Sequence, residues 1–322
     1  MSVSVIIPTY NRLPLLIETL DNILNQSLKP TEIIVVDNNS SDGTQDYLKH
    51  NYKGNVTLLN NKKNTPGAAR NLGLKIASGK FIKFMDSDDL ITTNTFLVQQ
   101  KILSESDTGV VYSPYVHFSK ENKVYKQLDV ILQYNPIPQN KSLHKCMVKG
   151  FFTIIPGFMF TKEFVQEIGP WREDITAYED WDYLWRIGNI CPNPSHTNEC
   201  CYFYRVHGQQ TTGNFYNNVQ RDSQKIDIFR GLYENYIKKD NNLFVVDKLF
   251  FLTQIPISLK NKKIREINNE NKQHFSNFII KLAKIFLRME SKLNRLLTNS
   301  DWQITHAICK DPQQFKHFLN WL

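Results

Sequence analysis

Hydrophobic runs and amphipathic stretches alternate regularly over the first 90 residues of the chain. Apolar runs with the length of buried strands occur at 3–7, 33–36 and 81–85, with a weaker one at 56–59. Between the first two runs, leucines and isoleucines recur every three or four residues from Leu13 to Leu24, as on one face of a helix. A second helix is predicted from Pro66 to Ala77. Strands that alternate with helices in this way are typical of an α/β fold with a parallel sheet.

The pattern changes after residue 108. Short strands are predicted at 110–112, 154–155 and 202–204, and a helix at 178–187. Beyond Gly213 the apolar spacing is almost wholly helical, and Asn and Lys are frequent. We therefore expect an α/β domain at residues 1–214, with halves at 1–108 and 109–214, followed by a helical region at residues 215–322.

Charge is distributed unevenly between these two regions. The chain has a net charge of +8, yet residues 1–214 contain 21 basic and 21 acidic side chains, whereas residues 215–322 contain 18 basic and 10 acidic ones. Within residues 276–297, apolar side chains share one helical face beside a ridge of Lys and Arg. Such a helix fits an anionic membrane surface, or it packs its apolar face on the rest of the protein. No nucleic-acid partner is expected.

Composition and cysteine content favour a globular cytoplasmic protein. Hydrophobic residues make up 41% of the chain and charged residues 22%, which is close to globular averages. The chain shows neither a membrane-spanning apolar run nor a signal-peptide pattern, and its five cysteines do not suggest a disulfide framework. We expect a cytoplasmic location, with peripheral attachment to the inner face of the cell membrane through the basic region. The spacing of Cys191, His196, Cys200 and Cys201 matches no usual zinc pattern and indicates buried thiols.

An acidic cluster, Asp86-Ser87-Asp88-Asp89, directly follows the third predicted strand. In open α/β sheets, ligands bind at the carboxyl ends of the strands, so this is a functional position. Three carboxylates within four residues repel one another, and a divalent cation relieves that repulsion while it grips a diphosphate. Oxygen ligands suit Mg²⁺ or Mn²⁺. The alternative is a solvated acidic turn that caps the next helix.

Two further polar segments end predicted strands. Asp37 follows the second strand and opens a helix, where its carboxylate could accept hydrogen bonds from a base or a ribose. Alternatively, Ser40 or Ser41 simply caps that helix. The first strand ends in the run 8–12, Pro-Thr-Tyr-Asn-Arg, whose ring and cation could hold a nucleobase and a phosphate. A plain strand-to-helix turn also explains Pro8 and Asn11.

Together these segments resemble glycosyltransferase family 2, whose members are inverting enzymes with the nucleotide-diphosphosugar-binding fold called GT-A. The matching segments are IIPTYNR at 6–12, VVDNNSSDGT at 35–44, PGAARNLG at 66–73 and FMDSDD at 84–89. The resemblance implies a GT-A type α/β fold and a glycosyltransferase activity. It does not extend over the last third of the chain.

The resemblance also implies residue roles. Asp37 would hold the base, Asp86 would lie near the ribose, and Asp88 would coordinate Mn²⁺ or Mg²⁺. Asn38 stands where an acidic residue is often found, which puts donor preference in doubt. The nucleotide-sugar donor, expected to be a UDP-sugar, would be contacted by Pro8, Thr9, Tyr10, Arg12, Asp37, Asn39, Arg70, Asp86 and Ser87.

The segment around Glu179-Asp180 resembles the family's acceptor side. Inversion requires a base that removes the proton of the acceptor hydroxyl, and by the resemblance Asp180, next to Glu179, is the candidate. Favourable charge at a helix amino terminus is the structural alternative. Asp174 and Asp182 are rival bases. His207, in a segment similar to the family's late strand, is a candidate second metal ligand or an ordinary surface or core histidine.

The sequence thus predicts transfer of a sugar from a nucleotide diphosphate to an acceptor hydroxyl. A saccharide or lipid-linked saccharide, in the synthesis of bacterial surface polysaccharide or lipid-linked oligosaccharide, suits the predicted location. A nucleotidyltransferase is one alternative, although the run 8–12 lacks the glycines of its phosphate loop. A non-catalytic carbohydrate- or polyanion-binding protein on a degenerate transferase fold is another.

Overall fold

The computed structural model describes residues 2–121, 124–128, 131–148, 151–176, 178–208 and 231. The chain divides into two compact units, of which the first contains the described residues up to Ile137 and from Thr153 to 208. The described part of the second unit contains the short helix α5 (Leu143–Val148). The predicted boundary near 215, the helical region and the candidate membrane helix at 276–297 lie outside the described residues, Gly231 excepted.

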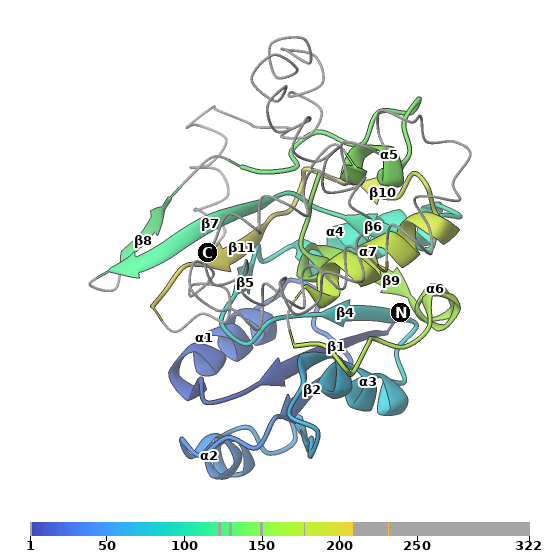
Figure 1. Cartoon of the computed structure of the whole chain (residues 1–322). Coiled ribbons are helices and arrows are strands. Elements are labelled where there is room, and N and C mark those ends of the chain that lie inside the picture. The colour runs from blue at the N-terminus through green and yellow to red at the C-terminus, as the bar shows by residue number, and fades with distance from the viewer. Residues whose placement is uncertain are drawn as a thin grey trace, which may run out of the picture. The chain divides into compact units, whose positions relative to one another are not determined.

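A mixed sheet of seven strands forms the framework of the first unit (Figure 1). Four parallel strands follow one another in the order β3-β2-β1-β4, and antiparallel β9 joins them to β6 and β10. The predicted α/β architecture is therefore confirmed. The strands are β1 (Val3–Thr9), β2 (Glu32–Asp37), β3 (Thr57–Asn60), β4 (Phe81–Phe84), β6 (Val110–Tyr112), β9 (Phe158–Thr161) and β10 (Ser195–His196).

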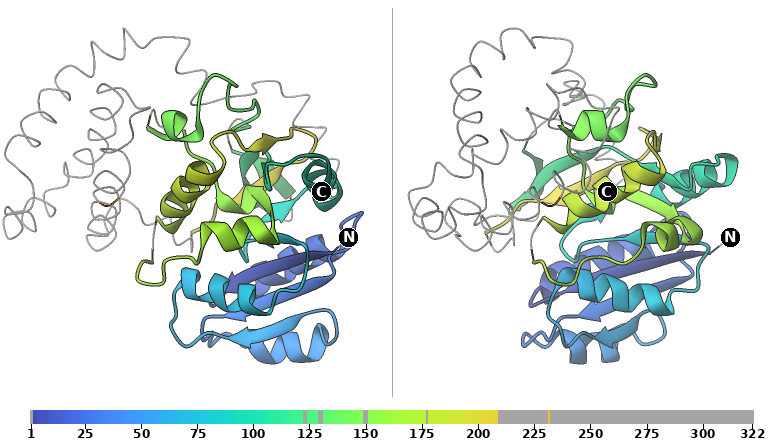
Figure 2. Two further views of the ribbon diagram at one scale, coloured as in Figure 1. Left: turned by 90° about the vertical axis from the view of Figure 1, so that its right-hand side faces the viewer. Right: turned by 45° about the vertical axis from the view of Figure 1, so that its right-hand side comes forward.

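Helices connect and cover these strands as the apolar spacing predicts. On α1, the positions Leu16, Leu20 and Ile23 are fully buried, and proline lies in the first turn, where its missing N–H costs nothing. Helix α3 packs along β1 and β2 (Figure 2), and a Cβ atom at Gly73 would lie 2.5 Å from Ile6 Cγ2. The helices are α1 (Leu13–Leu24), α2 (Thr44–Asn51), α3 (Pro66–Ile76), α4 (Thr95–Glu105), α6 (Lys162–Ile168) and α7 (Glu179–Ile190).

A second sheet of four strands was not predicted as a sheet, and only its β11 was anticipated. Its order is β5-β11-β7-β8, with bounds Leu90–Ile91, Tyr202–Arg205, Tyr115–Glu121 and Val124–Gln127. Strand β5 directly follows the acidic cluster and pairs with β11 through Ile91 and Leu90. This pairing brings residues from near position 205 beside residues 86–89.

The predicted strand at 154–155 is wrong. Residues Ile155–Gly157 form a turn of 3₁₀ helix, and the strand β9 begins only at Phe158. Pro156 explains the difference, because proline lacks the N–H that a central strand must donate.

One cation, Lys83 on β4, is fully buried in the core. Its ammonium group donates a hydrogen bond of 2.9 Å to Gln99 Oε1. Burial lowers the pKa of Lys83 to about 7, and the nearby Cys200 opposes this decrease. The apolar run at 81–85 predicts a buried strand, but it does not predict that the lysine within it is buried as well.

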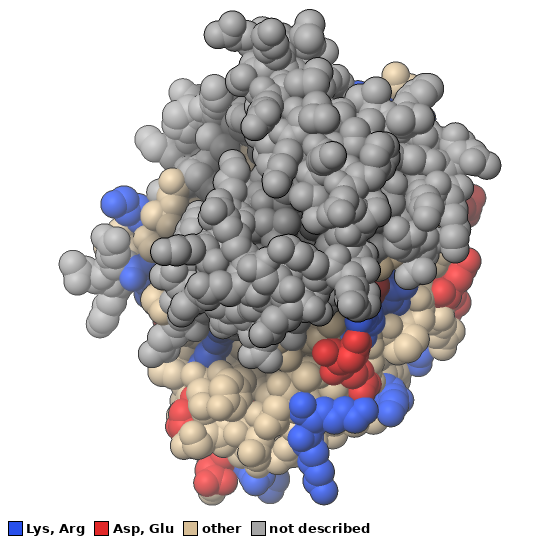
Figure 3. Space-filling view, viewed as in Figure 1, with Lys and Arg blue, Asp and Glu red and all other residues tan. Residues whose placement is uncertain are grey.

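Outside the core, the described basic and acidic side chains lie interspersed on the face shown in Figure 3. This agrees with the equal numbers of the two kinds in residues 1–214. In the part of the chain that the structure describes, no helix is long and apolar enough to span a bilayer.

Candidate active site

The candidate residues converge at the carboxyl ends of β1, β2 and β4. Because these three strands are adjacent and parallel, the loops that follow Thr9, Asp37 and Phe84 leave the sheet at the same edge. Pro8 and Thr9 end β1 as buried residues. The loop after β1 is bonded to the loop after β2, because the Asn11 amide donates to Ser40 Oγ at 2.9 Å and the Asn38 amide donates to the Thr9 carbonyl at 2.8 Å. The site therefore has a donor-side framework built from three loops.

The Asp37 loop is held by bonds between near neighbours in the sequence. Asp37 is fully buried, and its carboxylate accepts hydrogen bonds from the Ser40 amide, the Ser40 hydroxyl and Gln45 Nε2, the last at 2.7 Å. Asn39 adopts a left-handed conformation with φ +66°, which asparagine tolerates. The alternative in which Ser40 or Ser41 caps the next helix is wrong, because Gly43 is the residue that precedes α2 and it has no side chain to cap the helix. Ser40 bonds Asp37 instead, and the contact of Asp37 with a base or a ribose stays a prediction.

The loop after β1 offers one free ring and one unused hydroxyl. Tyr10 is 56% exposed, and the buried Thr9 Oγ1 has no hydrogen-bond partner among the described residues. The Asn11 side chain accepts a bond of 2.7 Å from the Ser41 amide, which ties this loop to the Asp37 loop. A buried hydroxyl without a partner beside an exposed ring is the kind of surface that a ligand completes.

Asp88 lies at the centre of a charged contact between β1, β4 and the segment after β11. Its Oδ2 atom is 2.5 Å from Arg12 Nη1 and 3.0 Å from His207 Nε2, and its side chain is only 8% exposed. The predicted metal residues Asp88 and His207 are therefore neighbours, although 119 positions separate them. Ser87 is buried between Asp86 and Asp88.

The chemistry of the Asp88–His207 pair fits a divalent cation. A carboxylate oxygen and an imidazole nitrogen lie within hydrogen-bond distance of each other, so one cation could contact both side chains. No cluster of three His, Cys, Asp or Glu side chains arranged for a metal occurs among the described residues. Two protein ligands suffice for Mg²⁺, which usually completes its shell with water and substrate phosphates.

The sequence assigns Asp89 a supporting role, and the structure shows which segment it supports. Its buried carboxylate accepts bonds from the Arg205 amide at 2.7 Å and from the Tyr202 hydroxyl at 2.6 Å, and burial raises its pKa well above the usual range. Arg205 in turn donates to the Asp88 carbonyl at 2.6 Å. These bonds fasten the end of β11 to the acidic cluster and so position His207. The spacing of Asp89 alone could not have revealed partners more than 110 residues away.

Arg70, which the family resemblance assigns to the nucleotide, joins two carboxylates, and its contact with a nucleotide stays a prediction. Its guanidinium is 3.0 Å from Asp86 Oδ1 and 3.1 Å from Glu179 Oε1, and it lies 4.4 Å from the centre of the Trp171 ring. Arg70 is 4% exposed. Burial raises the pKa of Asp86, the carboxylates of Asp88 and Glu179 add to the rise, and Arg70 opposes it. The donor-side Asp86 and the acceptor-side Glu179 thus share one cation.

Among the described carboxylates of this group, Asp180 is the one with a buried oxygen that has no hydrogen-bond partner. Its Oδ1 atom is shielded from solvent and accepts no hydrogen bond from any described residue. Burial raises its pKa to about 7; Glu179 and Asp86 contribute to the rise, while Arg70 and the Ile155 amide oppose it. A carboxylate that changes protonation near neutral pH, with an oxygen available, has the properties of a general base.

The rival bases have other partners. Asp182 lies 2.8 Å from Arg186 Nη2 one turn along α7, and Asp174 forms an exposed pair with Arg172. The residue before α7, Tyr178, has a left-handed backbone with φ +62°, which is strained for a bulky side chain. This backbone turn sets the direction in which Glu179 and Asp180 leave the chain.

Helix α3 also holds the loop that leads to Asp180. Asn71 Nδ2 donates to the Trp171 carbonyl at 2.9 Å, and Asn71 Oδ1 accepts from the Trp171 amide at 2.8 Å. A Cβ atom at Gly67 would lie 2.1 Å from the Arg172 carbonyl oxygen, so only glycine allows this close approach. The 66–73 motif therefore acts as a bracket between the sheet and the acceptor-side loop.

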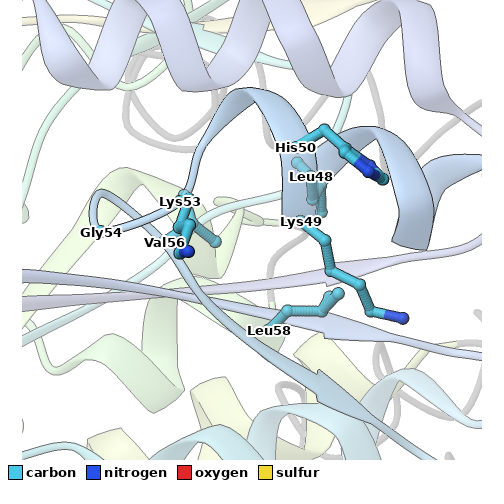
Figure 4. Close-up of a pocket in the computed structure, with 7 residues that line it drawn as sticks. All are labelled: Leu48, Lys49, His50, Lys53, Gly54, Val56 and Leu58. Atoms are coloured by element: carbon cyan, nitrogen blue, oxygen red, sulfur yellow. The ribbon is translucent and has the colours of Figure 1, made fainter.

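The cysteines and a surface hollow are not part of the site described above. Cys191, Cys200 and Cys201 are free thiols, and burial raises the pKa of Cys200 to about 12. A hollow of about 550 Å³ beside α2 and β3 contains none of the predicted site residues (Figure 4). It is lined by Leu48, Lys49, His50, Lys53, Gly54, Val56 and Leu58.

Comparison with known proteins places this geometry in context. The model of Glycosyl transferase family 2 matches residues 4–169, just over half of the 322 residues. Uncharacterized glycosyltransferases of Rickettsia bellii and Rickettsia felis are 36% and 38% identical over 39% and 38% of this chain, which spans about a fifth of their length. The uncharacterized glycosyltransferase YwdF of Bacillus subtilis is 31% identical over 58% of this chain and 68% of its own. A poly(ribitol-phosphate) beta-glucosyltransferase of Bacillus spizizenii is 38% identical over 34% of this chain and 18% of its own.

Solved structures agree on the fold. Residues 1–349 of S. aureus TarS in complex with UDP-GlcNAc give a TM-score of 0.60 at 20% identity, over 79% of this chain and 71% of that one. The mannosyltransferase PcManGT from Pyrobaculum calidifontis, in complex with GDP-Man and Mn²⁺, gives 0.55 at 19% identity over 94% and 84%. These likenesses confirm the predicted GT-A type α/β fold.

Proposed function

The chain belongs to glycosyl transferase family 2, and from this premise we propose that it is an inverting, metal-dependent enzyme that transfers a sugar from a nucleotide diphosphate to an acceptor hydroxyl. The observation that carries the proposal is the Arg70 contact. Because Arg70 bonds both Asp86 and Glu179, the carboxylate beside the donor strand and the segment with the candidate base belong to one compact site. Family membership favours this reaction over the nucleotidyltransferase and non-catalytic alternatives.

The donor is proposed to be a UDP-sugar that binds across the ends of β1 and β2. Tyr10 has an exposed ring that could contact the base, and Thr9 has a buried hydroxyl without a described partner. Asp37 and Asn39 lie in the neighbouring loop, after β2. The related fold of TarS binds UDP-GlcNAc and that of PcManGT binds GDP-Man, which supports a nucleotide-sugar and leaves the sugar open.

Asp88 and His207 would hold the divalent metal. A bound Mn²⁺ or Mg²⁺ would neutralise the charge that develops on the departing diphosphate. The structure of PcManGT with GDP-Man and Mn²⁺ supports the use of a divalent cation and leaves the ligand residues as a proposal. Asp89, Tyr202 and Arg205 keep the two ligand-bearing segments together through their buried bonds.

Asp180 would take the proton of the acceptor hydroxyl as that oxygen attacks the anomeric carbon opposite the diphosphate. Its oxygen without a hydrogen-bond partner and its pKa of about 7 support this role, since both the protonated and the deprotonated carboxyl are populated near neutral pH. Glu179, which Arg70 holds, would orient the start of α7 and so place Asp180. No covalent intermediate with the enzyme is required for inversion.

The acceptor is proposed to be a saccharide, or a lipid-linked saccharide, of a bacterial surface polymer. The similarity to a poly(ribitol-phosphate) beta-glucosyltransferase supports a surface-polymer acceptor. Attachment to an anionic membrane through residues 276–297, on the inner face of the cell membrane, stays a prediction that vesicle partitioning of full and shortened chains would check.

The proposal is tested by incubating the protein with a panel of UDP- and GDP-sugars and with Mn²⁺ or Mg²⁺, and by measuring the release of nucleoside diphosphate. Thermal unfolding with the same panel identifies donors independently, because a bound ligand raises the melting temperature. We expect one class of donor both to raise the melting temperature and to release nucleoside diphosphate. Chelation of the metal should abolish the release. A folded protein whose melting temperature and products respond to none of these donors would refute the proposal.

A further inference from the structure

Arg12 occupies an unusual position for a residue assigned to the nucleotide. Its Nη1 atom is 2.5 Å from Asp88 Oδ2, the same oxygen that lies 3.0 Å from His207 Nε2. All three side chains are largely buried, with exposed fractions of 17%, 8% and 18% for Arg12, Asp88 and His207. A guanidinium therefore contacts the very oxygen that the metal site would need.

The two cations compete for that oxygen. A divalent metal binds a carboxylate oxygen at about 2.0–2.1 Å, whereas a guanidinium only donates hydrogen bonds and cannot bridge to another cation. An arginine left in contact with Asp88 Oδ2 would also repel the metal, because the site is shielded from water and screening is weak there. The guanidinium therefore opposes metal binding at this oxygen, and moving it away would relieve the repulsion.

The backbone of Arg12 is held independently of its guanidinium. The Arg12 carbonyl accepts bonds from the amides of Leu15 at 3.0 Å and Leu16 at 2.9 Å, and the Arg12 side chain does not cap α1. The first amide of the helix, that of Leu13, donates to Asp42 Oδ2 at 2.9 Å. The helix therefore does not depend on the guanidinium. Since the residue directly follows β1, the side chain lies at the edge of the sheet where the donor's phosphates are proposed to bind, and arginine binds phosphate oxygens in a bidentate manner.

We propose that Arg12 is a displaceable counter-ion of the metal site, which neutralises Asp88 until a divalent cation takes its Oδ2 atom and which then binds the diphosphate of the donor. This inference rests on the proposed function and adds to it an order of binding, in which the metal binds before the diphosphate. Metal binding moves a cation from Asp88 to the nucleotide, so metal and nucleotide strengthen each other's binding.

The proposal is tested by the affinity for Mn²⁺ alone, measured as the loss of the paramagnetic resonance signal of free Mn²⁺. Arg12→Gln removes the competing cation, so we expect it to bind Mn²⁺ about tenfold more tightly than the unaltered protein, as the loss of one charge-assisted contact allows. With Mn²⁺ saturating, the same variant should bind UDP about tenfold more weakly by calorimetry. Two effects of opposite sign from one substitution are the signature of displacement.

Two variants control for folding and for general charge. Arg12→Lys keeps the charge and loses the planar fork, so its affinity for Mn²⁺ should lie between the other two. Lys49→Gln removes an exposed charge on α2, 3.8 Å from Asp46, and should leave the Mn²⁺ affinity unchanged. Thermal unfolding of each variant checks that the fold is retained.

Each outcome decides between the two levels of the proposal. If the unaltered protein binds Mn²⁺ and UDP but Arg12→Gln binds Mn²⁺ no more tightly, displacement is wrong while the proposed function stands. Tighter Mn²⁺ binding with an unchanged affinity for UDP would reject the movement to the diphosphate. Failure of the unaltered, folded protein to bind Mn²⁺ under any condition would overturn the metal-dependent function as well.

Discussion

The Asp37 loop and the Arg70 cluster lie at the same edge of one sheet, yet they are assembled in opposite ways. Asp37 is bonded by Ser40 and Gln45, three and eight positions away in the sequence. Arg70 bonds Asp86 and Glu179, sixteen and 109 positions away. The first region is a local turn, whereas the second exists only when the chain has folded around α3.

The two regions also differ in the charges that they bury. The Asp37 carboxylate is surrounded by hydroxyl and amide donors, which stabilise it without a second charge. Around Arg70, three carboxylates share one guanidinium, and burial raises the pKa of Asp86 and Asp180. Local loops can therefore tolerate the loss of one contact, while each charge in the Arg70 cluster affects the others.

The largest expected effect comes from Asp180→Asn. Loss of a general base lowers kcat by about 10²–10⁴-fold, so kcat should fall by this much with little change in donor KM. Stability should change in the opposite direction. The pKa of Asp180 is raised to about 7, so the stabilisation from its bound proton is full below the usual value of 3.8 and is lost as the pH rises through 7. At pH 8 the variant should unfold at an equal or higher urea concentration.

Asp182→Asn is the matched control for that experiment. Asp182 pairs with Arg186 on the same helix, so its substitution should cost stability and leave kcat within a few-fold of normal. In the unaltered protein, kcat/KM should rise with pH through about 7, because the base must be deprotonated. Retention of full transfer by Asp180→Asn would remove Asp180 from its role.

Arg70→Met should have the next largest effect. It leaves Asp86, Glu179 and Asp180 without their shared cation, and we expect a loss of about 3 kcal/mol in the free energy of unfolding, at the low end for a broken buried pair because Asp86 is 30% exposed. Arg70 opposes the raised pKa of Asp180, so the pH at which kcat/KM rises should move upward. Arg70→Lys should lose less unfolding free energy than Arg70→Met but should remain less stable than the unaltered protein, since lysine lacks the planar guanidinium that reaches two carboxylates. An unchanged pH profile in Arg70→Met would show that the cluster is not coupled.

The contrast between the two regions explains what the sequence could predict. The Asp37 loop and the acidic cluster end strands whose period and length are visible in the sequence, so their place at one edge follows from strand order. The neighbourhood of Asp88 and His207 followed from the family resemblance. In each case the information lies within a short motif.

The remaining contacts depend on packing between distant segments. Nothing near Arg70 in the sequence identifies Glu179 as its partner. The buried bonds of Asp89 with Tyr202 and Arg205 require a second sheet, of which only β11 was predicted. The predicted strand at 154–155 failed because Pro156 breaks the ladder after two apolar residues. Local patterns specify elements, and they leave the pairing of distant charges open.

Asn71→Ala tests the bracket between α3 and the acceptor-side loop. The variant leaves the amide and the carbonyl of Trp171 without their partner, and we expect a loss of about 2 kcal/mol. Because Trp171 packs on Arg70 and Tyr183, acceptor KM should also rise. Asn22→Ala is the control, since Asn22 bonds the amide and the carbonyl of Ile91 in the same way. It should cost similar stability in urea unfolding without a change in acceptor KM; equal kinetic effects of both variants would contradict the bracket.

The smallest effect should come from Gln45→Ala in the Asp37 loop. Gln45 donates one bond of 2.7 Å to Asp37, which keeps its two bonds from Ser40, so the expected loss is about 1 kcal/mol of unfolding free energy. Donor affinity, measured by calorimetry, should weaken by less than about fivefold, because the backbone of the loop is fixed by near neighbours and kcat depends on the distant cluster. If Gln45→Ala instead lowered kcat as strongly as Arg70→Met, the two regions would be one cooperative unit, and the distinction between a local donor loop and a long-range catalytic cluster would be wrong.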